Sequence, residues 1–508
     1  MIFKSKILRD TAMLTLMQLC LDTAALLLNV FITKKLGTSA IGILTLTGSF
    51  LGLAGIISNG NAFLCMSRMI SGELGRSGGN PNRVLFHGIR LCMMLSLTVS
   101  AAVFFFAEPI SSRFFSGADM AAAIRFMPVA LVSGAVSSCF KGYFNAGRKS
   151  SITAAGDVLE FVVKSVVIIF STLAVVSPTE GTVCEIMIAG IIAGNLSSLI
   201  FFLIAFAGNH GHYSGHGTLS FREYAAFAFP IMGGGILTAS LSSANDALIP
   251  MCLRQNGDSV AQAFSNFGIF EAIVIPTLFF PSVVLCSMSG IIVSETARAS
   301  AAGNKERIKI FSERLTRWTL MFSIFAAAVL MRFGRPIGEL LGGGETAGKM
   351  ISVIAPVVPF IYMEIVLEAM IKGMGLQAFS SLNYLAEYAV RIAIVLIFVP
   401  RIGFYGIAAS YYASNVLGNC SRFIKLLRTT KMKFKPLCMI TVPIVYAYMT
   451  MCPAQILMRI MGMEGKSIPE MVIYTVVWGT GYFTVFTVLG GIRISDRKTS
   501  LKIVESAQ

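Results

Sequence analysis

Charge is scarce in this sequence. Asp, Glu, Lys and Arg make up 13% of its 508 residues, whereas a soluble domain carries roughly 25%. The ten cysteines form no CxxC pair, and three of the four histidines share one segment, 210–216, that has no cysteine or acidic neighbour. These scarcities exclude a soluble globular domain, and we expect neither a disulfide framework nor a metal site.

Long apolar segments take the place of the missing charge. Hydrophobic residues make up 55% of the chain, and they come in blocks of about 20, the length at which a helix crosses a membrane. We therefore predict an all-α polytopic membrane protein with fourteen transmembrane helices. The spans are expected at 11–33, 41–64, 84–107, 120–146, 152–176, 183–207, 224–252, 264–293, 316–333, 347–371, 379–400, 404–426, 436–456 and 469–491.

The chain has a formal net charge of +16, and its bases gather between alternate spans. The largest basic clusters, at 298–317 and 422–435, fall on the same side as the N-terminus. Because cytoplasmic loops are enriched in Lys and Arg, we expect both termini on the cytoplasmic side of the cell membrane. The charges are spread along loops without a nucleic-acid-binding module, so we expect no nucleic-acid partner.

A charged, glycine-rich turn, "ISGELGRSGGN" at 70–80, follows the second span. Its glycines suggest a loop that binds phosphate through backbone N–H groups. However, "VSETARASAAGN" at 293–304 follows the eighth span and repeats Glu73 as Glu295, with an arginine three residues later in both segments. Most of the glycines are lost in this second copy. The repeated feature is the charged turn, so we predict a connection between spans and no phosphate-binding loop.

A second repeat links the fourth and tenth spans. "PVALVSGAVSSCFKG" at 128–142 and "PFIYMEIVLEAMIKG" at 359–373 both begin with proline and end with Lys-Gly at the same spacing. Since an even number of spans separates the copies, the repeat is parallel. We predict two six-helix lobes, at 1–215 and 216–430, followed by two additional spans and a basic tail at 431–508, an arrangement typical of transporters.

Four motifs carry a resemblance to a known family. They are "KKLGTSAIGILTL" at 34–46, the charged turn at 70–80, "KGYFNAG" at 141–147 and "RIGFYGIAASYYASNVLG" at 401–418. With these motifs the chain resembles the multidrug/oligosaccharidyl-lipid/polysaccharide (MOP) flippase superfamily. It is most similar to the branch of oligosaccharide flippases and stage V sporulation protein B-like proteins.

The resemblance implies a transporter that flips a polyprenyl-pyrophosphate-linked saccharide across the cytoplasmic membrane by alternating access, for cell-envelope polysaccharide or peptidoglycan synthesis. We expect a monomer in contact with membrane lipids and with its lipid-linked saccharide. No hydrolytic triad or nucleotide-binding P-loop is present in the sequence, so we expect no enzyme activity and no cofactor. Transport would then draw on Na⁺ or H⁺ coupling, the membrane potential or consumption of the product.

Phosphates crossing the membrane would need cations in the cavity that the resemblance implies between the lobes. The candidates for substrate binding are Arg68, Lys141, Lys164 and Arg391. Arg68 lies at the inner end of the second span, where an interfacial arginine is the alternative interpretation. Lys164 and Arg391 each follow an acid, Glu160 and Glu387, by four residues. That order favours an intrahelical ion pair, so a structural role is the alternative.

Intramembrane acids are candidates for ion coupling. Glu364 and Glu368 lie one turn apart on the tenth span, where the fourth span has serines. The alternative is an ordinary Glu368–Lys372 ion pair. Asp22 in the first span and Asp246 in the seventh are further candidates.

The seventh span contains "FPIMGGGILTAS", in which Pro230 and Gly234 weaken the helical hydrogen-bond ladder. We expect gating movements here, although glycine also serves close helix packing in membranes. The main rival function is a cation-coupled multidrug exporter of the same superfamily, which would typically have twelve spans. A polysaccharide polymerase or ligase would be expected to show a large outer loop.

Overall fold

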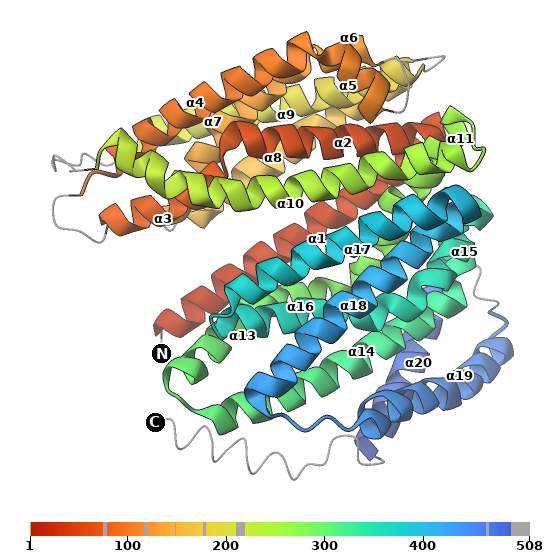
Figure 1. Ribbon diagram of the computed structural model, residues 1–508. Helices are drawn as coiled ribbons and strands as arrows, with labels where there is room; N and C mark the ends of the chain where they lie inside the picture. The colour runs from red at the N-terminus through yellow and green to blue at the C-terminus, as the bar shows by residue number, and fades with distance from the viewer. Residues whose placement is uncertain are drawn as a thin grey trace. The chain divides into compact units, whose positions relative to one another are not determined.

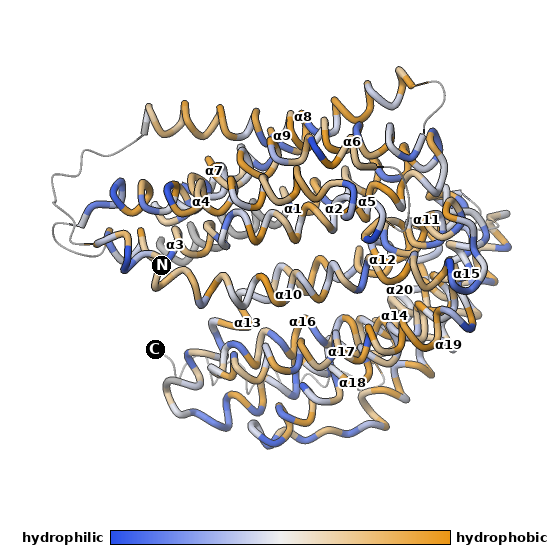
Figure 2. Tube along the Cα trace, turned by 45° about the horizontal axis from the view of Figure 1, so that its top comes forward, coloured by the Kyte–Doolittle hydropathy of each residue, from blue (hydrophilic) through white to orange (hydrophobic). Residues whose placement is uncertain are grey.

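The computed structural model describes residues 2–74, 79–115, 120–147, 149–175, 179–209, 219–463 and 467–488. Within these ranges every regular element is helical. Figure 1 shows the helices along the chain, and Figure 2 shows that hydrophobic residues make up most of the length of the long ones. The histidine segment at 210–216 lies outside the described residues.

The helices before residue 276 are α1 (Ile2–Leu36), α2 (Thr38–Asn59), α3 (Ala62–Leu74), α4 (Pro81–Phe105), α5 (Ala107–Phe114), α6 (Ala121–Ile124), α7 (Met127–Ala146), α8 (Ser150–Ala174), α9 (Glu180–Asn209), α10 (Phe221–Gln255) and α11 (Val260–Gly268), with a π-helical turn at Ile269–Val274. The later helices are α12 (Ile275–Phe279), α13 (Val283–Ala301), α14 (Lys305–Leu340), α15 (Gly344–Ile354), α16 (Val358–Gly373), α17 (Gln377–Ile402), α18 (Phe404–Thr430), α19 (Val442–Ile460) and α20 (Ile468–Val488). Short 3₁₀ turns at Phe280–Ser282 and Ala355–Val357 and a π-helical turn at Leu437–Thr441 join neighbouring pieces.

The predicted all-α polytopic class is confirmed. Eleven helical segments within the described residues are long and apolar enough to cross a membrane. The remaining predicted spans coincide with three more long helices: α1 with 35 residues, α8 with 25 and α18 with 27. Each of the fourteen predicted spans therefore corresponds to a helical segment of the structure.

The chain divides into two compact units. Unit 1 comprises Met1–Pro276 and Tyr388–Ser410, and unit 2 comprises Thr277–Glu387 and Tyr411–Gln508. These units are groups of residues in mutual contact, whereas the predicted lobes are two copies of a sequence repeat, so the units do not test the lobe boundaries. The lobe boundaries at 215 and 430 therefore stay a prediction.

In unit 1, α4, α7 and α9 lie side by side (Figure 1), and α3 also packs on α7. The core that joins them is aromatic and sulfur-rich, with Met66, Phe140, Phe202 and Tyr224 buried. Burial of such large side chains stabilises helix contacts in a membrane mainly through close packing.

In unit 2, α14 packs against α15 and α16 and also contacts the C-terminal pair α19 and α20. Phe325 of α14 stacks on Tyr482 of α20 with ring centroids 5.1 Å apart. Trp478, which is 1% exposed, donates a hydrogen bond to the Ala447 carbonyl at 3.0 Å. The two additional spans are thus built into the core of unit 2.

The glycine of the repeated Lys-Gly motif marks the same helix crossing in each unit. A Cβ added to Gly142 on α7 would lie 2.8 Å from the Phe63 carbonyl oxygen on α3. A Cβ added to Gly373 on α16 would lie 2.7 Å from the Val293 carbonyl oxygen on α13. Only glycine permits these close approaches, and their correspondence supports the repeat.

The charged turns share a helix cap as well. Asn80 accepts a hydrogen bond from the Arg83 backbone N–H at 3.1 Å, and Asn304 accepts one from Arg307 at 2.9 Å. In the first turn the Glu73 carboxylate accepts a hydrogen bond from the Asn80 backbone N–H at 3.2 Å. The Glu73 carboxylate thus occupies the Asn80 N–H, whereas residues 75–78 of the turn lie outside the described residues, so a connecting turn without a phosphate site stays a prediction.

Candidate functional site

A buried arginine organises the largest charge cluster of unit 2. Arg422 of α18 is 1% exposed. Its guanidinium contacts Glu364 and Glu387 at 3.0 Å and Glu368 at 3.4 Å. A planar guanidinium with several donors suits this task, because it can bind more than one carboxylate at once.

The neighbouring helices position these acids. Glu364 and Glu368 lie one turn apart on α16, and the Ser380 hydroxyl donates a hydrogen bond to Glu368. Gly418, one turn before Arg422 on α18, leaves room for Glu387, since a Cβ there would lie 2.5 Å from its carboxylate oxygen. Asn383 of α17 donates to the Gly418 carbonyl at 3.1 Å. The cluster therefore ties α16, α17 and α18 together.

Arg422 is a site residue that the sequence pattern does not reveal. It was counted in the basic loop cluster at 422–435, an interpretation that is wrong for this residue because α18 continues to Thr430 and buries its side chain. The ion pair between Glu368 and Lys372, which was the alternative interpretation of the acids in the tenth span, is present, since the Lys372 ammonium lies 3.1 Å from the Glu368 carboxylate. Glu364 and Glu368 are thus both neutralised by bases, and ion coupling at them stays a prediction.

A second charge cluster lies in unit 1. The Lys141 ammonium of α7 contacts Asp157 at 2.7 Å and Glu160 at 2.9 Å, both on α8. It borders a cavity of about 170 Å³ that α2, α7, α8 and α9 line together, with Ser137 and Asn195 among its polar residues. No motif in the sequence points to Asp157 or Asn195.

The expected intrahelical pair of Glu160 with Lys164 is wrong. Glu160 forms its ion pair with Lys141 of the neighbouring helix instead. Lys164 is half-buried, lies 5.5 Å from the centroid of the Phe161 ring, and has no ion-pair partner among the described residues. Lys164 therefore forms no ion pair among the described residues, although Glu160, one turn earlier on α8, still attracts it electrostatically.

Asp246 of α10 lies in a polar environment of a different kind. Its carboxylate accepts hydrogen bonds from the Ser49 hydroxyl at 2.7 Å and from the Asn245 amide at 3.3 Å. Arg391 of α17 attracts it electrostatically, although no Lys or Arg of the described residues forms an ion pair with it. Asp246, one of the four predicted ion-coupling residues, thus has a carboxylate that hydroxyl and amide groups surround and that forms no ion pair among the described residues.

The other predicted residues lie apart from these clusters. Arg68 is exposed on α3 and has no ion-pair partner among the described residues. Asp22 is exposed on α1 and accepts a hydrogen bond from Gln18 at 2.9 Å. The guanidinium of Arg391 lies 5.0 Å from the centroid of the Tyr388 ring. Their predicted roles stay predictions.

The predicted gating positions lie within one continuous helix. Pro230 and Gly234 both belong to α10, which runs from Phe221 to Gln255. A Cβ added to Gly233 or Gly234 would meet nothing within 4 Å in the described structure. Packing within the described part of unit 1 therefore does not account for these two glycines, and a hinge at this point stays a prediction.

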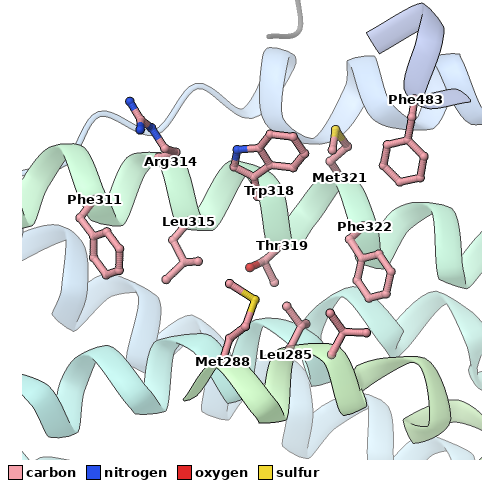
Figure 3. A pocket seen from close by; sticks show the side chains of 11 residues that line it. Leu285, Met288, Phe311, Arg314, Leu315, Trp318, Thr319, Met321, Phe322 and Phe483 are labelled. Atoms are coloured by element: carbon pink, nitrogen blue, oxygen red, sulfur yellow. The ribbon is translucent and has the colours of Figure 1, made fainter. Parts of the chain in front are cut away.

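An apolar groove of about 500 Å³ lies in unit 2 between α13, α14 and α20. Figure 3 shows Leu285, Met288, Trp318 and Phe322 around it. Arg314 is the charged member of its lining. This surface is suited to hydrocarbon rather than to a polar ligand.

Two solved structures with a similar fold are described as a flippase and a transporter. "Lipid II flippase MurJ, inward closed conformation" is 13% identical, with a TM-score of 0.68, and the match covers 94% of this chain and 99% of that one. An inward-facing multidrug resistance MATE family transporter of the MOP superfamily is 15% identical, with a TM-score of 0.62, covering 81% and 96%. The fold is thus that of MOP superfamily membrane transporters.

The family model described as "Polysaccharide biosynthesis protein" matches residues 7–261, half of the chain. The chain belongs to this family. "Stage V sporulation protein B" of Bacillus subtilis (strain 168) is 20% identical over 401 residues, covering 76% of this chain and 77% of the relative. The family and the fold agree with the predicted superfamily, and the long apolar helices make the protein a multi-pass membrane protein.

Proposed function

We propose that this transporter moves a saccharide linked to polyprenyl pyrophosphate from the inner to the outer leaflet of the cytoplasmic membrane by alternating access. The observation that carries the proposal concerns two cations of unit 1, Lys164 within the predicted fifth span and Arg68 beyond the inner end of the predicted second span. Arg68 and Lys164 have no ion-pair partner among the described residues. Unpaired cations are costly in a membrane and are expected where an anionic substrate passes.

The roles of the substrate-binding residues follow from these surroundings. Arg68 is the first phosphate contact because its guanidinium is exposed and offers two parallel donors. Lys164 provides a second positive charge. Arg391 and Lys141 complete the predicted set, although the two carboxylates on Lys141 leave it less able to bind a phosphate.

The lipid part of the substrate needs only apolar surroundings. Its chain would stay in the bilayer while headgroup and phosphates cross, and the groove beside Trp318 offers an apolar surface for it. We place both termini in the cytoplasm and take the working unit to be a monomer.

Leaflet-resolved labelling of lipid-linked saccharide tests this proposal. Depletion of the protein should trap the lipid-linked saccharide in the inner leaflet. Arg68→Ala and Lys164→Ala should each reproduce the defect at normal protein levels, because each removes a cation from the substrate path. Arg125→Ala is the matched control, since Arg125 is exposed and pairs with Glu108; it should transport normally. Full transport by both test variants would exclude them as phosphate contacts.

The second candidate function is a cation-coupled exporter of the same superfamily. The observation in its favour is Asp246, a carboxylate surrounded by hydroxyl and amide groups and without an ion pair among the described residues. Under this alternative, depletion would leave the leaflet distribution of lipid-linked saccharide unchanged. Cells would instead accumulate cationic dyes.

A further inference from the structure

Lys141 occupies the centre of a small oxygen-rich site. Its ammonium lies between Asp157 and Glu160, at 2.7 and 2.9 Å, and all three side chains are partly accessible, with exposed fractions of 21%, 42% and 30%. Lys141 and Glu160 also line the cavity of about 170 Å³ in unit 1. A positive charge thus lies where two acids converge, at a place that a small solute can enter.

The cavity wall adds neutral oxygen atoms to this site. Ser137, one turn before Lys141 on α7, lines the cavity and is 2% exposed. Its hydroxyl oxygen is buried and has no hydrogen-bond partner in the described part of the chain. Buried hydroxyls are normally paired, so this atom indicates an incomplete polar site in the cavity that Lys141 also lines.

Unit 2 also has a basic side chain that lies between carboxylates, but the base is an arginine. Arg422 lies among Glu364, Glu368 and Glu387, just as Lys141 lies between its two acids. In both of these clusters the carboxylates are paired with a cation that is covalently part of the chain. Removing two adjacent carboxylates from water without any cation would be strongly unfavourable.

We propose that Lys141 is a resident cation, which takes the place that a small monovalent ion would otherwise fill between Asp157 and Glu160. The negative charges of Asp157 and Glu160 are then balanced by the chain itself, whatever the external ion concentration. Unit 1 therefore has a latent site for Na⁺ or an alkylammonium ion, which opens when the lysine side chain is removed. This inference does not depend on which substrate is transported.

Thermal unfolding of the purified full-length protein in different chloride salts tests the proposal. At equal ionic strength, the native protein should have the same Tm in sodium, potassium, methylammonium and choline chloride. Lys141→Ala should have a lower Tm in choline, a cation too large for the site. Sodium or methylammonium should raise that Tm by on the order of 2 °C at about ten times the dissociation constant.

Two matched variants control for non-specific effects. Lys349→Ala removes an exposed lysine that pairs with Glu345, and its Tm should not depend on the cation. A triple variant, K141A with D157N and E160Q, removes the acids together with the lysine and should also lose the cation response. If Lys141→Ala does not fold, K141A/E160Q keeps Asp157 and should show a weaker but measurable response.

The proposal is overturned if neither Lys141→Ala nor K141A/E160Q responds selectively to a small cation. It is equally overturned if the native protein is stabilised by sodium over choline as strongly as the variant, because the site would then already bind an external ion. Leaflet labelling of the saccharide is a separate measurement, so failure here leaves the proposed transport function intact.

Discussion

Replacing Arg422 with methionine leaves three carboxylates, Glu364, Glu368 and Glu387, without their shared base. Methionine keeps much of the apolar stem, so the main loss is the charge. Glu387 is 4% exposed, and removing one partner of a buried ion pair costs about 3–5 kcal/mol. For a unit of this size, 3 kcal/mol corresponds to a fall in Tm of roughly 6–12 °C.

Thermal unfolding of the purified protein measures this effect. Arg422→Met combined with Glu387→Gln should recover part of the loss, because one uncompensated charge disappears with the base. The control is Lys349→Met, which breaks an exposed pair with Glu345 and should change stability by less than about 1 kcal/mol. A Tm for Arg422→Met within about 1 °C of the parent would refute the idea that this arginine holds α16, α17 and α18 together.

Gly418→Ala should lower the Tm, because the added Cβ would lie 2.5 Å from the Glu387 carboxylate. Gly233→Ala is the control: the space around Gly233 is open, so its Tm should stay unchanged or rise. Equal effects of the two substitutions on the Tm would argue against a steric cause. Asn304→Ala removes the N-cap of α14 and should cost about 1 kcal/mol in chemical denaturation, and an unchanged midpoint would contradict the cap. Asp246→Asn should reduce any Na⁺ or H⁺ dependence of transport in vesicles, because its carboxylate lacks an ion pair among the described residues; an unaltered dependence would rule Asp246 out.

Hydropathy predicts long helices well, because the membrane requires them and leaves few alternatives; eleven of the predicted spans fall on helical segments that are apolar enough to cross a membrane, and the other three fall on the long helices α1, α8 and α18. The repeated turn and the Lys-Gly motif could also be read from the sequence. Both reflect local constraints: an Asn cap in one case, and a glycine at a helix crossing, at Gly142 and Gly373, in the other.

The charge partners could not be predicted in the same way. The i, i+4 rule pairs Glu160 with Lys164 along one helix, but the packing of α7 against α8 brings Lys141 closer. Arg422 begins a basic run that resembles a cytoplasmic loop, and only the length of α18 shows that it is buried. Sequence spacing describes neighbours within a helix, whereas these contacts depend on which helices pack together.

The central claim is that Arg68 and Lys164 serve the passage of a phosphate-bearing lipid. The most direct test is transbilayer movement of a fluorescent polyprenyl-pyrophosphate-linked saccharide in vesicles that contain the purified protein. We expect rapid movement with the native protein and with Arg125→Ala, and a large loss with Arg68→Ala and Lys164→Ala. Equal rates in vesicles with native protein and in protein-free vesicles would contradict the claim.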